Sequence, residues 1–220
     1  MANGVLESPS THDRDPDRPP RGVRDPAVLE AMRAVPREAF VSAGLQGSAY
    51  EDRALPIAEG QTISQPYIVA AMVQAAQLQP GDRVLEVGAG SGYAAAVLSR
   101  IATHVFAIER HAALTDAARA RCQVLGYENI AFRTGDGSMG WPEDAPFDAI
   151  LVSAGGPQPP EALKQQLKID GRLILPVGNT TEQRLWRIRR LSDTEFPRED
   201  LGGVCFVPLI GVEGWHAPSA

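Results

Sequence analysis

Residues 83 to 92 read Arg-Val-Leu-Glu-Val-Gly-Ala-Gly-Ser-Gly, an apolar run that contains one acid and is followed by alternating glycines. The run from Val84 to Val87 is typical of a buried strand in a parallel sheet. The glycines let the chain turn tightly and bring its backbone against a ligand before the next helix begins. They are Gly88, Gly90 and Gly92. This stretch therefore predicts a strand, a ligand-binding turn and the start of a helix in an α/β sheet.

The spacing of these glycines indicates which cofactor the turn binds. In the Gly-x-Gly-x-x-Gly pattern of nicotinamide and flavin dinucleotide sites, the third glycine falls where this chain has Tyr93. The spacing therefore disfavours a turn that binds the pyrophosphate of a dinucleotide. A cofactor without phosphates, held by the acid Glu86 on the strand, fits S-adenosyl-L-methionine better. The product of that cofactor is S-adenosyl-L-homocysteine.

Two more acids follow later strands of the same predicted sheet. Glu109 ends an apolar segment that begins at His104, and Asp136 and Gly137 lie in a Gly-Asp-Gly turn after a short strand. The carboxyl ends of successive strands are where open α/β sheets bind ligands. We therefore expect Glu109 and the Asp136 turn to contact the adenosine part of a cofactor. The alternatives are a solvated charge for Glu109 and a simple turn former for Asp136.

The alternation of hydrophobic periods predicts the fold class. Strands are expected over 83–87, 104–109, 130–133, 147–153 and 171–177, and helices over 93–101, 112–125 and 160–168. This βαβ rhythm predicts a doubly wound, mostly parallel, Rossmann-like sheet. Two later apolar segments, 185–188 and 204–210, are expected to add antiparallel edge strands.

The amino-terminal part is predicted to be helical. Asp25 is a plausible N-cap with Pro26 at the first helical position, and Pro36 ends that helix before a second short one. Gln65-Pro66 starts a further helix that reaches Leu78.

The length of 220 residues suits one domain with additions at its ends. We expect a single domain over 26–210, composed of a helical and substrate segment, a cofactor-binding core and edge strands (26–80, 81–178 and 179–210). Residues 1–25 are rich in proline and charge and are expected to form a loose tail. Residues 211–220 are expected to form a second tail.

Composition excludes several classes of function. The formal charge of −6 argues against a dedicated nucleic-acid binder, although a basic patch over Arg184–Arg190 stays open. The chain has two isolated cysteines, Cys122 and Cys205, and its histidines lack ligand spacing, so we expect no metal site. No apolar run has the length of a membrane span or a signal peptide, which favours a cytoplasmic protein that does not bind membranes.

The segment before the glycine turn is irregular, yet it carries two hydroxyls. Residues 54–66 fit neither a strand nor a helix, and Thr62 and Ser64 stand just before the predicted helix start. Ser64 can be read as an N-cap. The same geometry, a hydroxyl beside free backbone N–H groups at a helix start, can also receive a carboxylate.

Seven segments together resemble one enzyme family. They are Leu55-Pro-Ile-Ala-Glu-Gly-Gln-Thr-Ile-Ser-Gln-Pro66, Glu86-Val-Gly-Ala-Gly-Ser-Gly-Tyr93, Ile108-Glu-Arg110, Gly135-Asp-Gly137, Ala145-Pro-Phe-Asp148, Leu175-Pro-Val-Gly178 and Phe206-Val-Pro-Leu209. Their order and spacing over residues 26–210 resemble the protein-L-isoaspartate O-methyltransferase family, a group of class I S-adenosylmethionine-dependent enzymes. The sequence departs from the family pattern at Ser153-Ala-Gly-Gly-Pro157, which is richer in glycine, and at Ile210, where some relatives carry threonine.

The resemblance implies an activity and roles for individual residues. It implies methyl transfer to the α-carboxylate of L-isoaspartyl residues in damaged proteins, after which the ester closes to a succinimide. It makes Ser64 the active-site residue and assigns the cofactor's adenosine part to Glu109, Asp136 and Gly137. It also implies a substrate peptide bound along 54–66, through Thr62, Ile63 and Ser64, and along the segment containing Val207.

This chemistry needs no general base, because an α-carboxyl group is ionised at neutral pH. The absence of a His/Asp or Cys/His pairing near the predicted site is therefore consistent with it. We expect a monomer. Two alternatives stay open: a methyltransferase of a small-molecule acid or an amine, and a cofactor-binding module without activity. The sequence Ser153 to Pro157 replaces the Asn/Asp-Pro-Pro-Tyr turn of base amine methyltransferases, and the intact 54–66 segment argues against an inactive module.

Overall fold

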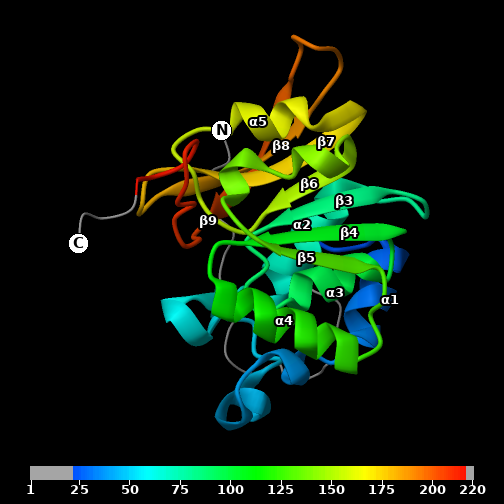
Figure 1. Ribbon diagram of the computed structural model, residues 1–220, viewed down its shortest axis with the longest axis vertical. Helices are drawn as coiled ribbons and strands as arrows, with labels where there is room; N and C mark the ends of the chain where they lie inside the picture. Colours follow the sequence, from blue (N-terminus) through cyan, green and yellow to red (C-terminus); the bar gives the residue numbers. More distant parts are fainter. Residues whose placement is uncertain (1–21, 217–220) are drawn as a thin grey trace.

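The computed structural model describes residues 22–216 (Figure 1). Its centre is a seven-stranded sheet in the order β5-β4-β3-β6-β7-β8-β9. The strands are β3 (Arg83–Val87), β4 (His104–Glu109), β5 (Ile130–Thr134), β6 (Phe147–Val152), β7 (Leu167–Gly178), β8 (Gln183–Arg189) and β9 (Arg198–Val204). The first five in spatial order are parallel, whereas β8 is antiparallel to both of its neighbours.

The strand order places a ligand-binding crevice at the centre of the sheet. From β3 the chain builds outwards through β4 to β5, and it then returns to add β6 on the other side of β3. Such a reversal leaves a gap between connections that run in opposite directions, at the carboxyl ends of the strands. The glycine turn follows β3 directly and therefore lies in this gap.

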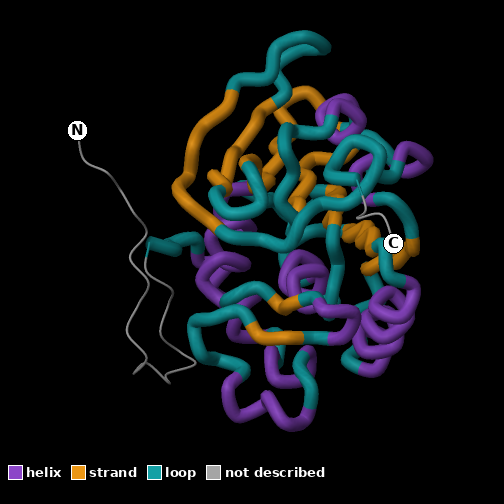
Figure 2. Tube along the Cα trace, turned by 90° about the vertical axis from the view of Figure 1, so that its left-hand side faces the viewer, coloured by secondary structure: helices purple, strands orange, loops and turns teal. Residues whose placement is uncertain are grey.

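Helices cover both faces of the sheet (Figures 1 and 2). They are α1 (Pro26–Ala34), α2 (Pro66–Ala76), α3 (Tyr93–Ser99), α4 (Ala112–Val124) and α5 (Glu161–Gln165). Alternate residues of β3 point to opposite faces. Val84 packs in a cluster with residues of α1, α2 and α3, while Leu85 packs in a second cluster with Leu163 of α5.

Most predicted elements are confirmed, and the differences lie near their ends. The helix expected over 160–168 ends at Gln165, and β7 starts at Leu167 rather than at 171. Leu167 is fully buried and pairs with Phe147 of β6, so tertiary packing overrides the helical pattern there. The short helix expected after Pro36 consists of two 3₁₀ helices, η1 (Arg37–Phe40) and η2 (Ala43–Ser48).

The prediction of an edge strand over 204–210 is wrong. The outermost strand β9 instead spans Arg198–Val204, whose start is polar. It pairs with β8 in antiparallel fashion, and Arg184 and Asp200 form an exposed ion pair across the two strands at 2.8 Å. The apolar residues after Val204 leave the sheet and cross its carboxyl edge, where Leu209 N donates to Gly155 O at 2.8 Å.

Parts of both expected tails, residues 22–25 and 211–216, belong to the described structure. Residues 1–21 and 217–220 lie outside the described part of the chain. Val23 is buried, and the Arg24 and Asp25 amides donate to Gln74 Oε1 on α2 at 2.6 and 3.0 Å. At the other end, Trp215 Nε1 donates to Gly155 O at 3.0 Å. The packed region is therefore larger than 26–210 on both sides.

The irregular 54–66 segment forms a small hairpin. The two-residue strands β1 (Leu55–Pro56) and β2 (Thr62–Ile63) pair in antiparallel fashion around η3 (Ala58–Gly60). Leu55 and Ile63 are buried and anchor the hairpin to the core. This arrangement carries the Thr62–Ser64 stretch to the carboxyl edge of the sheet.

A substitution at Gly137 tests how closely the chain packs behind β3. A Cβ atom on Gly137, in η4 (Gly137–Met139), would lie 2.5 Å from Val87 Cγ1. We expect Gly137→Ala to lower the free energy of unfolding by about 1 to 3 kcal/mol, because the buried β-branched neighbour has no room to move. Gly203→Ala is the control, because nothing lies within 4 Å of its added Cβ. Equal unfolding free energies for the two variants in urea would contradict this packing.

Candidate functional site

A cavity of about 950 Å³, counted with its open mouth, lies at the carboxyl ends of β3, β4 and β6. Several stretches far apart in the sequence line it. They include the glycine turn with the start of α3, residues 61–64 of the hairpin, and the extended segment 207–210. The cavity thus joins the predicted cofactor turn to the predicted substrate segment.

The glycine turn presents its backbone to this cavity. Gly88, Gly90 and Gly92 all have positive φ angles, as the predicted tight turn requires. A Cβ on Gly90 would reach Ile57 Cδ1 at 3.5 Å, so the hairpin lies directly over this residue. Gly92 faces the other way, since its Cβ would lie 3.1 Å from Ala118 on α4. Gly88 and Gly90 line the cavity, whereas Gly92 allows close helix packing.

Glu109, at the end of β4, ties that strand to the glycine turn. Its Oε2 accepts from Gly90 N at 3.0 Å, and its Oε1 accepts from His111 N at 3.0 Å. The residue is buried and lines the cavity, while its contact with the adenosine part of a cofactor stays a prediction. Each carboxylate oxygen can accept a further bond, so the group can bind ligand hydroxyls while it holds the turn.

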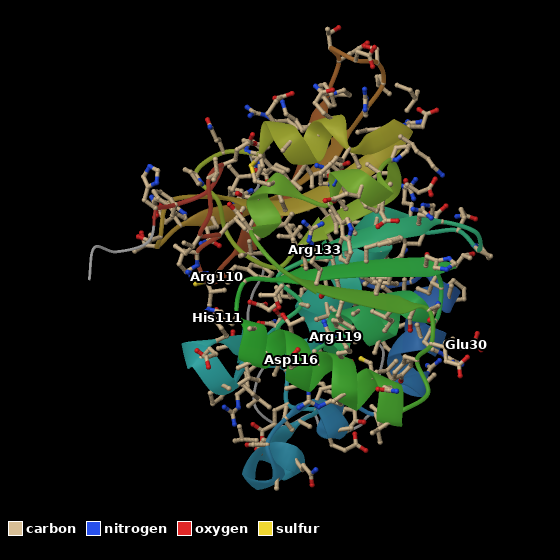
Figure 3. All side chains as sticks on the ribbon, in the orientation of Figure 1. Glu30, Arg110, His111, Asp116, Arg119 and Arg133 are labelled. Carbon is tan, nitrogen blue, oxygen red and sulfur yellow. The ribbon has the colours of Figure 1, made fainter. Side chains whose placement is uncertain are left out.

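The start of α4 also contacts the hairpin. Figure 3 shows Arg110 and His111 at the end of β4, on the side where η3 lies. His111 Nδ1 is 3.6 Å from Glu59 Oε2 in η3. Arg110 lines the mouth of the cavity. The hairpin is therefore held near the turn by a polar contact as well as by Ile57.

Glu86 is the most unusual group in the cavity. It is buried, and neither of its carboxylate oxygens has a hydrogen-bond partner. Burial raises its pKa well above 4.5, and the nearby charge of Glu109 raises the pKa further. A buried carboxyl without partners is costly in the absence of a ligand. Glu86 lines the cavity, where it can bind a ligand that carries a positive charge or N–H donors.

Asp136 and Gly137 do not line this cavity. Asp136 Oδ1 accepts from Ser138 N and Ser138 Oγ at 2.9 and 2.7 Å, and Oδ2 accepts from Val212 N at 2.8 Å. The carboxylate thus anchors the end of the described chain. The Gly-Asp-Gly pattern in the sequence could not reveal this use, because the partner lies 76 residues away. Contact of Asp136 and Gly137 with a cofactor stays a prediction.

The predicted substrate residues are brought together on the other side of the cavity. Thr62, Ile63, Ser64 and Val207 all line it. The alternative reading of Ser64 as a helix cap is wrong, because the N-cap of α2 is Gln65 and no side chain caps it. The Ser64 carbonyl accepts from Arg37 Nη2 at 2.8 Å. The side chain of Ser64 is therefore not used to cap the helix.

Two residues that support this side were not recognised in the sequence. Gln183 is buried, and its amide forms a pair of bonds with the Phe206 backbone, donating to Phe206 O at 3.1 Å and accepting from Phe206 N at 2.8 Å. Arg37 holds Ser64. Both act on backbone atoms of residues distant in sequence, so no local spacing could have identified them.

Both cysteines are free thiols, and they lie in different environments. Cys205 is exposed, whereas Cys122 on α4 is buried behind the glycine turn, with Sγ 3.9 Å from Gly92 O. Burial, followed by the charge of Glu86, raises the pKa of Cys122 to about 12.

Over residues 22–216 no cluster of three potential metal ligands occurs. Within the same range, no helix is long and apolar enough to cross a membrane.

Comparison with known proteins identifies relatives over almost the whole chain. A protein-family model described as Protein-L-isoaspartate(D-aspartate) O-methyltransferase matches residues 17–214. A protein-L-isoaspartate O-methyltransferase from Methylorubrum extorquens is 64% identical over 198 residues, covering 90% of this chain and 86% of the relative. One from Rhodopseudomonas palustris is 59% identical over 199 residues, covering 90% of this chain and 91% of the relative.

Solved structures show the same likeness. A protein-L-isoaspartate O-methyltransferase superposes with a TM-score of 0.79 at 33% identity over 88% of this chain, which spans 63% of that structure's chain. A Plasmodium falciparum structure named for the same activity, in complex with S-adenosyl-L-homocysteine, superposes with a TM-score of 0.76 at 27% identity. That match covers 86% of this chain and 93% of the Plasmodium chain.

The pKa shift of Glu86 predicts how stability depends on pH. Because its folded-state pKa lies above 4.5, the folded protein holds a proton that the unfolded chain releases as pH rises. The contribution of Glu86 to the free energy of unfolding of the wild-type protein therefore falls as pH rises above about 4.5. We expect Glu86→Gln, without ligand, to raise the melting temperature at pH 8, and the gain to shrink towards pH 4.5.

Glu143→Gln serves as the control, measured by calorimetry over the same pH range. Arg133 lowers the pKa of the exposed Glu143 carboxyl, so its replacement should produce no such gain at pH 8. A Glu86→Gln protein that is less stable than wild type at pH 8 would mean that the Glu86 carboxylate is stabilised as an anion.

Proposed function

This chain belongs to the protein-L-isoaspartate(D-aspartate) O-methyltransferase family, and we propose that it methylates the free α-carboxylate of L-isoaspartyl residues in damaged proteins and peptides. S-adenosyl-L-methionine is the methyl donor. The observation that carries this proposal is one cavity lined by both the Glu86–Glu109 side and the Ser64 side. In the resulting methyl ester, the backbone amide nitrogen of the following residue can attack the ester carbonyl carbon and release methanol. The succinimide formed in this way is then hydrolysed in part to aspartate.

The donor side of the cavity suits the cofactor in charge and shape. S-adenosyl-L-methionine, when bound, supplies a methyl group on a positively charged sulfur. Two buried carboxyls, Glu86 and Glu109, face the cavity, and the oxygens of Glu86 lack protein partners. We assign the ribose hydroxyls to Glu109, the cofactor's donor groups to Glu86, and close backbone contact to Gly88 and Gly90. Gly92 contributes by packing against α4.

The acceptor side needs to orient an oxygen rather than to remove a proton. The α-carboxyl group has a pKa of about 3.5 and is already ionised at neutral pH. Ser64 can donate its hydroxyl to one carboxylate oxygen and leave the other directed at the methyl group. The segment Val207–Ile210 helps to close the cavity against water.

The peptide on either side of the isoaspartyl residue is proposed to lie between two backbones. Thr62 and Ile63 form one edge, and the extended stretch around Val207 forms the other. Main-chain hydrogen bonds to such edges make the flanking sequence matter little. We also propose that the protein is a monomer and that it acts in the cytoplasm.

Ser64→Ala tests the role of the hydroxyl. Since Ser64 does not cap α2, its loss should leave the free energy of unfolding within about 0.5 kcal/mol of wild type. We expect kcat/KM for an isoaspartyl peptide to fall at least about tenfold, with cofactor affinity nearly unchanged. Steady-state assays with calorimetric titration of S-adenosyl-L-homocysteine measure both effects. Equal activity per folded molecule would remove Ser64 from the reaction.

A pair of matched peptides tests the substrate. An isoaspartyl residue carries its carboxylate on the α-carbon and routes the main chain through the side-chain methylene, so its aspartyl twin offers the oxygen in the wrong place. A misplacement of about one ångström costs on the order of a hundredfold in rate. We expect labelled methyl ester on the isoaspartyl peptide and almost none on its twin. Comparable labelling of both peptides would overturn the repair function, as would labelling of a small-molecule acid alone.

A further inference from the structure

Arg37 carries a charge into the interior of the protein. Its side chain is fully buried, and burial lowers its pKa. It lies in η1, directly after Pro36, outside every stretch that lines the cavity. Burying a guanidinium is costly unless its N–H groups find partners.

The partners of Arg37 are backbone carbonyls from two different segments. Nε donates to Ala49 O at 2.6 Å, and Nη2 donates to Ser64 O at 2.8 Å. Nη1 is buried without a partner. The negative charge of Asp52 offsets part of the effect of burial on the Arg37 pKa, and the Asp52 carboxylate accepts from Tyr67 N at 3.1 Å. The rigid fork of the guanidinium thus sets the place of the Ser64 main chain.

The flat face of the same group contacts the cofactor side of the site. The Arg37 Cζ atom lies 4.8 Å from the centre of the Tyr93 ring. Tyr93 is buried, lines the cavity and begins α3 immediately after Gly92 of the glycine turn. Phe40 packs on Tyr93 with ring centres 5.5 Å apart, which restricts the ring. One side chain therefore touches both the acceptor segment and the residue that follows the donor turn.

We propose that Arg37 is a positioning residue for methyl transfer, which fixes the Ser64 backbone relative to Tyr93 and so sets the separation of the acceptor and donor sides. The proposal rests on the function proposed above. Its effect passes through Ser64, because the guanidinium does not line the cavity. Loss of this link should misplace the substrate carboxylate rather than weaken the cofactor site.

A double-mutant cycle with Arg37→Met and Ser64→Ala separates positioning from general packing. In the wild-type background, Arg37→Met should lower kcat for an isoaspartyl peptide at least about tenfold per folded molecule, with the Kd of S-adenosyl-L-homocysteine changed less than about threefold. In the Ser64→Ala background, Arg37→Met should lower kcat less than about threefold. Equal losses in both backgrounds would overturn the proposal.

Arg172 supplies a matched control at the opposite end of α2. Its Nε donates to Ala76 O at 2.7 Å and its Nη2 to Gln77 O at 2.9 Å, so it also holds two backbone carbonyls. Arg172→Met should lower the free energy of unfolding. Its effect on kcat should be the same in the wild-type and the Ser64→Ala backgrounds. Should Arg37→Met not fold, Arg37→Lys, which keeps the charge but cannot span both carbonyls, replaces it in the cycle. Full activity of a folded Arg37→Lys protein would count against the proposal.

Amide hydrogen exchange gives a readout that does not depend on the substrate. We expect Arg37→Met, or Arg37→Lys in its place, to speed exchange over residues 61–64 at least about tenfold, and Arg172→Met to leave it unchanged. Unchanged exchange over 61–64 in the Arg37 variant would overturn the positioning role. If the wild-type protein does not methylate the isoaspartyl peptide, the proposed function fails, while exchange still decides the role of Arg37.

Discussion

The bonds from the Glu109 carboxylate to two backbone amides connect the fold to the site. One amide belongs to Gly90 in the turn after β3, and the other belongs to His111 at the start of α4. A carboxylate at the end of β4 thereby fixes the turn of the neighbouring strand. The hairpin lies beside Gly90, where Ile57 Cδ1 would be 3.5 Å from an added Cβ, so the turn and the acceptor side are close neighbours. If the turn moved, both sides of the cavity would move with it.

Charge in the site is arranged to favour a cationic ligand. Glu86 and Glu109 are both buried in one cavity, and the repulsion between them contributes to the raised pKa of Glu86. The buried guanidinium of Arg37 is not directed at this pair, because it donates to the Ala49 and Ser64 carbonyls. Such an arrangement costs stability in the free protein and returns it when a positively charged ligand binds.

The sequence predicts the central strands and the ligand turn, and it identifies several residues that line the cavity, among them Glu86, Glu109 and Ser64. Parallel strands and glycine turns have local patterns, and the residues that follow strand ends meet at one edge of the sheet. It fails where a distant partner decides the outcome. The apolar stretch after Val204 suggests a strand, but its backbone bonds Gly155 instead of a sheet neighbour. Likewise, the residues around Arg37 in the sequence give no sign that its side chain is fully buried.

The two cysteines differ in chemical reactivity because of where they lie. The thiol of Cys122, with its pKa raised to about 12, stays protonated behind the glycine turn and is a poor target for oxidants and alkylating reagents. Cys205 is exposed and stands two residues before Val207, which lines the cavity. A thiol-reactive fluorophore added to the native chain should therefore attach at Cys205, next to the proposed peptide path. Such labelling would leave the cofactor turn unmodified.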